Sequence, residues 1–127
     1  MKISKIYDTA LYLAEKLDDT TGYIDDEYRS FNKMKALEII KQAAMSVALI
    51  ENFSLIDTER LTMEDELMLP FYYCKFVIPL YLGALLCHQD GEEDKYNFLI
   101  SEYQNLIERV KHDESSCFDS SVLEGLR

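Results

Sequence analysis

Residues 61–91, LTMEDELMLPFYYCKFVIPLYLGALLCHQDG, form the stretch of this chain that decides its fold. From Leu67 to His88 almost every side chain is apolar, and Lys75 is the one charged residue near the centre. A segment this apolar must be shielded from water on nearly all sides. The shield can be a membrane, the rest of the fold, or neighbouring copies of the chain.

A membrane is the least suitable of these three shields. A helix that spans a bilayer needs about 20 apolar residues without an uncompensated charge, and here Lys75 would lie near the middle of the span. Pro70 and Pro79 interrupt the segment, and acidic residues flank it where basic anchors are usual. We therefore expect no membrane span.

The aromatic residues of the segment exceed what one core can hold. Phe71, Tyr72, Tyr73, Phe76 and Tyr81 fall on all sides of a helix and cannot all point inward. Tyrosine is favoured at interfaces, where its ring is buried and its hydroxyl keeps a polar partner. Self-association is therefore predicted, through an interface that comprises Tyr72, Tyr73, Phe76, Tyr81, Leu82 and Leu85.

The length and composition of the chain favour one small helical domain. The chain has 127 residues, four glycines and two prolines, with frequent leucine, isoleucine, alanine and tyrosine. It carries 24 acidic and 13 basic residues, a formal net charge of −11. Because phosphate binding requires clusters of Lys and Arg, this charge argues against binding of nucleic acid.

The cysteines and the N-terminus favour production in the cytoplasm. The three cysteines, Cys74, Cys87 and Cys117, are odd in number and lack a CxxC spacing, which indicates a reducing compartment. The N-terminal segment MKISKIYDTALYLAEKLDD breaks its apolar pattern with Asp8 and Glu15, so it has no continuous signal-peptide core.

Apolar residues recur at steps of three and four along much of the chain, the spacing that places side chains on one helix face. Four helices are predicted, over residues 3–17, 25–50, 71–89 and 92–111. Pro79 cannot donate a backbone hydrogen bond, so we expect a kink or a restart there. Asp90 is predicted to cap the last helix.

The connecting segments complete the predicted fold. Residues 18–22 form a loop, and residues 51–66 are irregular, with a short strand or an extended arm at about 54–61. The helical pattern stops after His112, and the remaining polar tail is too poor in apolar residues to fold alone. We predict an all-α fold, a small bundle of about four helices over residues 1–112, followed by an extended tail over residues 113–127 that is disordered or ordered by a partner.

The sequence contains no constellation typical of an enzyme. His88 and His112 have no second ligand one helical turn away, so no metal site and no cofactor are predicted. Acidic clusters at 25–27, 64–66 and 92–94 resemble magnesium ligands, but each lies near a predicted helix start, where negative charge compensates the helix dipole. Phosphate-binding loops and nucleophile elbows are absent from the sequence. We predict that the chain is not an enzyme.

The stretch ELMLPFYYCKFVIPLYLGALLCHQDGEEDKYNFLISEYQNLIE resembles the C-terminal half of head-to-tail connector, or adaptor, proteins of tailed bacteriophages and prophages. Those proteins show a Leu-Pro pair, a helix with an Ile-Pro-Tyr element, an acidic turn, and a helix with Phe and Tyr. The matching positions are Leu67, Leu69, Pro70, Ile78, Pro79, Tyr81, Leu82, Ala84, Asp90, Phe98 and Tyr103. Leu80 departs from the pattern by separating Pro79 from Tyr81.

The resemblance implies a structural role in the neck of a virion. Family members assemble as rings of about twelve copies beneath the portal, extend the DNA channel and dock the next neck or tail protein. An acidic channel wall repels phosphate, so DNA passes without specific binding. The candidate channel-facing residues are Asp18, Asp19, Asp25 and Asp26. The candidate portal-binding tail holds Phe118, Val122, Leu123 and Leu126.

Two other functions are compatible with the sequence. A small helical interaction module, such as a regulator or chaperone, would form a compact dimer through the third helix. An all-α metal-dependent nucleotide hydrolase would bring carboxylates together in one pocket and would require magnesium.

Overall fold

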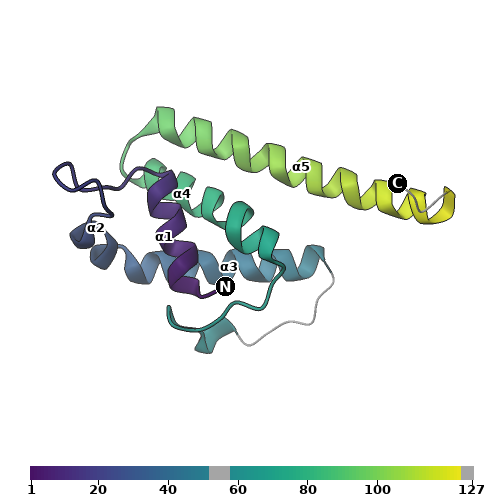
Figure 1. Cartoon of the computed structure of the whole chain (residues 1–127), viewed down its shortest axis with the longest axis horizontal. Helices are drawn as coiled ribbons and strands as arrows, with labels where there is room; N and C mark the ends of the chain where they lie inside the picture. The colour runs from purple at the N-terminus through teal and green to yellow at the C-terminus, as the bar shows by residue number, and fades with distance from the viewer. Residues whose placement is uncertain (52–57, 124–127) are drawn as a thin grey trace.

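The computed structural model describes the backbone of residues 1–51 and 58–123 and the side chains of residues 1–51 and 58–110. It confirms the predicted all-α fold, and the described part of the chain contains isolated bridges but no strands (Figure 1). The helices are α1 (Ile3–Leu13), α2 (Asp26–Phe31), α3 (Lys33–Ile50), α4 (Ile78–Gln89) and α5 (Glu93–Leu123), with a 3₁₀ turn η1 (Thr58–Arg60) and a π-helical turn η2 (Tyr73–Val77).

The central element of the bundle is α4, which contacts α1, α3 and α5 (Figure 1). This helix is apolar on nearly all sides, and its buried residues include Ile78, Leu82 and Leu86. Gly83 allows the closest approach, since a Cβ atom at this position would lie 3.3 Å from the Ala10 carbonyl oxygen of α1. The apolar segment is therefore shielded largely by the chain's own helices. In the described part of the chain, no helix is long and apolar enough to span a membrane.

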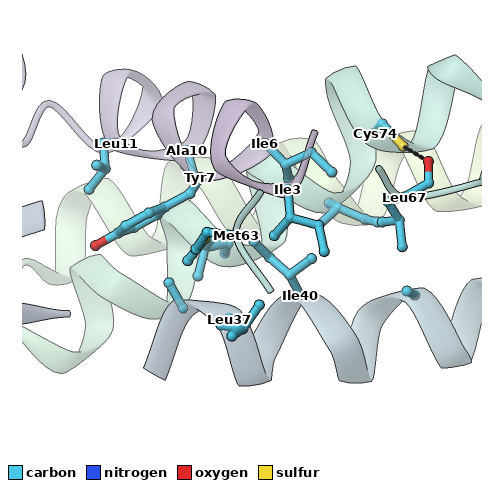
Figure 2. Packing of buried hydrophobic residues seen from close by; sticks show 14 of the residues in the cluster. Ile3, Ile6, Tyr7, Ala10, Leu11, Leu37, Ile40, Met63, Leu67 and Cys74 are labelled. Carbon is cyan, nitrogen blue, oxygen red and sulfur yellow. Dashed lines mark hydrogen bonds between the residues drawn. The ribbon is translucent and has the colours of Figure 1, made fainter. Parts of the chain in front are cut away.

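The main core lies between α1 and α3 and is closed by α4 (Figure 2). Ile3, Ile6 and Ala10 are fully buried, as the spacing of apolar residues predicts. They face Leu37 and Ile40 of α3. Burial of this face of α1 is what holds a short helix without a side-chain cap in place.

The segment that precedes α4 supplies the missing cap of α1. The backbone carbonyls of Met63 and Asp65 accept hydrogen bonds from the N–H groups of Ser4 and Ile3, at 2.8 and 3.0 Å. These N–H groups would otherwise be unpaired at the helix start. The predicted extended arm at 54–61 is misplaced in part, because η1 occupies Thr58–Arg60 and the extended contact with α1 lies nearer residue 65. Residues 52–57 lie outside the described part of the chain.

Two predicted helices have different bounds in the structure. The first ends at Leu13 rather than at residue 17, because Glu15 adopts a positive φ of 58° and the chain turns away from the helix axis. The second is divided into α2 and α3 at Asn32, which is 4% exposed. The Asn32 side chain donates a hydrogen bond at 3.1 Å to the Tyr28 carbonyl oxygen, which also accepts from the Asn32 N–H at 3.0 Å, and this local bonding marks the end of α2.

The chain is helical over the predicted range 71–89, and near Pro79, where a kink or a restart was predicted, it forms a π-helical turn without a break. The helix widens into the π-helical turn η2, and the Ile78 N–H bonds to the Tyr73 carbonyl oxygen five residues earlier. Pro79 is then the second residue of α4, a position at which a missing N–H group is tolerated.

The last helix is longer than predicted. It begins at Glu93 and its backbone continues through Leu123, past the predicted end at residue 111, so that its C-terminal part extends beyond the other helices (Figure 1). The predicted portal-binding side chains Phe118, Val122, Leu123 and Leu126 lie outside the side chains that the structure describes.

Candidate functional site

Three aromatic side chains of the apolar segment lie at the surface of η2 and of the helical residues just before it. Phe71 is 63% exposed and Phe76 is 47% exposed, whereas an average core residue of this chain is almost fully covered. The Tyr72 ring lies 5.8 Å from the Phe76 ring, and the Lys75 ammonium lies 5.9 Å from the centre of the Phe71 ring. We call Phe71, Tyr72, Lys75 and Phe76 the aromatic surface.

The structure divides the predicted interface residues between core and surface. Leu82 is fully buried, and Tyr73 is 5% exposed with its hydroxyl bonded to Glu51. The interface prediction is therefore wrong for Leu82, which has no surface to offer a neighbouring subunit, and Tyr73 offers almost none. Tyr72, Tyr81 and Leu85 are half-buried, and Phe76 is exposed.

Tyr81 lies in a groove between α3 and α5 rather than on the aromatic surface. Its ring lies 5.1 Å from that of Tyr103, and burial raises the pKa of Tyr103. The groove has a volume of about 190 Å³, and α4 forms its floor. None of the side chains that line it is charged, although charged residues make up 29% of the chain. Apolar and uncharged surface is what a protein partner can cover at the least cost in desolvation.

Three of the four predicted channel-facing acidic residues lie in the connection between α1 and α2, and the fourth, Asp26, is the first residue of α2. Asp18 and Asp25 have local structural roles: Asp18 Oδ1 accepts a hydrogen bond from the Thr20 N–H at 2.7 Å, and Asp25 Oδ1 caps α2 by accepting from the Glu27 N–H at 3.0 Å. Asp19 and Asp26 are exposed. The structure of one chain does not test which of these residues face a channel.

A polar cluster that the sequence does not reveal surrounds the buried Lys16 and joins the ends of four helices. The Lys16 side chain is 9% exposed and lies 2.7 Å from Asp90 Oδ2, and it also pairs with Glu92. The Tyr28 hydroxyl donates a hydrogen bond to the same Asp90 oxygen at 2.6 Å. Asp90 thus ties the α4–α5 turn to α1 and α2 and does not cap α5 as predicted. The partners of Lys16 are more than 70 residues away in sequence, so no local pattern predicts this cluster.

The cluster shifts the pKa values of Lys16, Asp90 and Glu92 in favour of their charged forms, whereas burial and the bond to Asp90 raise the pKa of Tyr28 and keep its hydroxyl neutral. Burial alone would lower the pKa of Lys16, but hydrogen bonds to Asp90 and Glu92 outweigh burial, and the pKa is raised. Burial opposes ionisation of Asp90 in the same way, but hydrogen bonds from Lys16, Tyr28 and Gln89 lower its pKa. The bond from Lys16 is the main cause of the lowered pKa of Glu92. Lys16, Asp90 and Glu92 are therefore ionised at neutral pH.

The cluster predicts a specific acid sensitivity. Because the pKa values of Asp90 and Glu92 are lower in the folded state, their contribution to stability is present above their usual values of 3.8 and 4.5 and is lost as the pH falls below them. We expect Lys16→Met to lower the free energy of unfolding by about 2 kcal/mol at pH 7, because it leaves the partly buried Asp90 carboxylate without its cation and leaves Glu92 with Lys95 alone. The difference from wild type should shrink between pH 5 and pH 3, within the range where this linkage acts.

Urea denaturation followed by circular dichroism over this pH range measures the effect. Lys2→Met is the matched control, because Lys2 faces Glu64 at 3.7 Å in an exposed pair that should contribute little. Equal pH dependence in wild type and Lys16→Met would mean that the Lys16 cluster does not couple folding to protonation.

The described residues contain no group of three or more His, Cys, Asp or Glu side chains placed to hold a metal ion. Comparison of the chain with protein-family models, with curated proteins and with solved structures found no match. The candidate functional site is therefore defined by the geometry of this chain: the aromatic surface and the uncharged groove.

Proposed function

We propose that this chain is a structural protein of the phage neck, a head-to-tail connector that assembles as a ring beneath the portal and docks the tail. The observation that carries the proposal is the aromatic surface, where Phe71 and Phe76 are 63% and 47% exposed beside Tyr72. These residues lie inside the segment that resembles connector proteins. Monomeric proteins seldom expose clustered aromatic side chains without a partner to cover them.

The distribution of charge supports the same proposal. A ring has heterologous contacts, in which one surface of each copy meets a different surface of the next. Two copies with a net charge of −11 repel one another, so their contact should be made through surface that is poor in acidic residues. The aromatic surface contains one cation and no acid, and the groove between α3 and α5 is lined by uncharged side chains.

The aromatic surface also favours a second function, that of a small helical interaction module that forms a compact dimer. A small helical regulator or chaperone would bury Phe71 and Phe76 against the same residues of a second copy. The two functions predict different assemblies: the dimer forms in the isolated protein, and the connector forms a ring of about twelve copies on the portal.

The test uses the purified chain alone and with the portal ring from the same source. We expect negative-stain images of the mixture to show a ring below the portal, and light scattering to show the corresponding mass. Phe71→Ser combined with Phe76→Ser should abolish the added ring while the circular dichroism spectrum stays helical, because neither side chain belongs to the buried core. Phe98→Ser is the control, since Phe98 is 65% exposed on α5, away from the aromatic surface. If the chain forms a dimer both alone and with the portal ring, and does not bind the portal, the neck assignment would be overturned in favour of the interaction module.

A further inference from the structure

A second cleft lies between α2 and the turn that joins α4 to α5. Its volume is about 350 Å³, and Asp25, Glu27, Phe31 and Asp90 are among its lining residues. Phe31 is 85% exposed, more than any other large apolar side chain of the described residues. The Phe31 ring is therefore left largely to water, in a cleft that carboxylates also line.

Hydrogen bonds join several of the residues that line this cleft. Gln89 Nε2 donates to Asn32 Oδ1 at 2.9 Å, and the Tyr28 hydroxyl donates to Asp90. Lys35 donates to Gln89 Oε1 at the rim. Since Lys16 compensates the charge of Asp90, the negative charge that remains for a ligand comes mainly from Glu27 and Asp25.

The chain uses the combination of an aromatic ring and a carboxylate twice to hold its own cations. The Lys16 ammonium lies 5.1 Å from the centre of the Tyr28 ring and 2.7 Å from Asp90. The Arg29 guanidinium lies 5.8 Å from the centre of the Tyr7 ring and 2.8 Å from Asp8. Both arrangements combine cation–π attraction with an ion pair.

Phe31 and Glu27 line the same cleft and so bring a ring and a carboxylate to one place at the surface, and within the described residues no lysine or arginine of the chain lies over the Phe31 ring. An anionic ligand would be repelled by Glu27 and Asp25. A purely apolar ligand would cover the same carboxylates without pairing them, which costs free energy. The occupant that satisfies both the ring and the carboxylates is a cation with a flat apolar face.

We propose that this cleft binds an arginine side chain of a partner protein. The guanidinium group stacks on Phe31 and pairs with Glu27, since its planar fork suits both an aromatic face and a carboxylate. The net charge of −11 attracts such a basic segment over long range. The proposal is independent of the neck assignment, because it concerns one side chain of a partner and needs no assembly of this chain.

The probe is the peptide acetyl-Gly-Arg-Gly-amide, added to the ¹⁵N-labelled protein in 0.15 M salt and followed by NMR chemical shifts. The matched peptide with citrulline keeps the shape of arginine but carries no charge, and the peptide with lysine keeps the charge without the planar group. We expect the arginine peptide to shift the amides of residues 25–32 and 88–91 in a saturable manner. The lysine peptide should bind more weakly, and the citrulline peptide should not bind.

Two variants locate the site. Phe31→Ala and Glu27→Gln should each weaken binding of the arginine peptide about threefold, the size typical of one exposed cation–π or ion-pair contact. Phe98→Ala and Glu102→Gln, which change exposed residues of the same types on α5, should leave it unchanged. Shifts spread over all acidic surfaces, equal binding of the citrulline peptide, or unchanged affinity in both cleft variants would overturn the proposal.

Discussion

Replacing Leu82 with alanine should lower the free energy of unfolding by about 3 kcal/mol, within the range measured for leucine-to-alanine changes in packed cores. Leu82 is fully buried in the main core of the bundle, on the central helix α4. The change removes the apolar contacts of the side chain and leaves a cavity that the surrounding helices can fill only in part. Urea denaturation followed by circular dichroism measures the loss, and the melting temperature should fall by about 10 °C.

Phe76→Ala is the matched control for this prediction. It removes a larger apolar side chain from the same segment, but Phe76 is 47% exposed, so the free energy of unfolding should change by less than about 1 kcal/mol. Equal stability of the Leu82→Ala and Phe76→Ala variants would contradict the division of the apolar segment into core and surface.

Replacing Gly83 with valine should have an effect of similar size, for the opposite physical reason. A Cβ atom at residue 83 would lie 3.3 Å from the Ala10 carbonyl oxygen and 3.6 Å from Leu99 Cδ1, so α1 and α5 both approach α4 closely here. The branched side chain of valine would extend into the backbone of α1, which cannot rotate away. We expect a loss of about 3 kcal/mol, the upper end for overpacked cores.

Alanine at the same position separates steric strain from helix propensity. Gly83→Ala adds one methyl group in a tight contact, but it also gains about 1 kcal/mol in helix propensity, so its stability should stay close to that of wild type. Ser101→Val on the exposed face of α5 measures the intrinsic cost of valine in a helix and should be small. If Gly83→Val were as stable as Ser101→Val, α1 and α4 could not be packed as closely as the structure has them.

The features of the fold that depend on local pattern are predictable from the sequence. The buried face of α1 follows from the spacing of Ile3, Ile6 and Ala10, and the irregular helical turn near Pro79 follows from a missing N–H group. The all-α class follows from the same periodicity. Each of these features depends on residues that are at most a few helical turns apart.

The features that depend on distant contacts are not predictable in this way. In the sequence, Lys16 is indistinguishable from an ordinary polar residue near a helix end. Only folding brings it close to Asp90 and Glu92. The cap of α1 comes from backbone carbonyls of residues 63 and 65, which have no side-chain signature. The break at Asn32 has a weak local signal, because asparagine often bonds to its own backbone, but the apolar pattern on both sides favours one continuous helix.

The candidate site was predictable as a segment but not residue by residue. The sequence shows that the apolar segment has more aromatic side chains than one core can hold, and the structure places Phe71 and Phe76 at the surface. The sequence cannot show that Leu82 belongs to the core. The residues of α4 are apolar on nearly all sides, so their periodicity does not distinguish the face toward α1 from any other.

The central claim is that the aromatic surface is an assembly interface. Native mass spectrometry of the purified chain mixed with the portal ring of the same source tests it most directly. The proposal predicts a complex in which about twelve copies add to the portal for wild type and the Phe98→Ser control, and none for the Phe71→Ser and Phe76→Ser double variant. The claim would be contradicted if the double variant added to the portal in the same number of copies as wild type, or if wild type did not add at all.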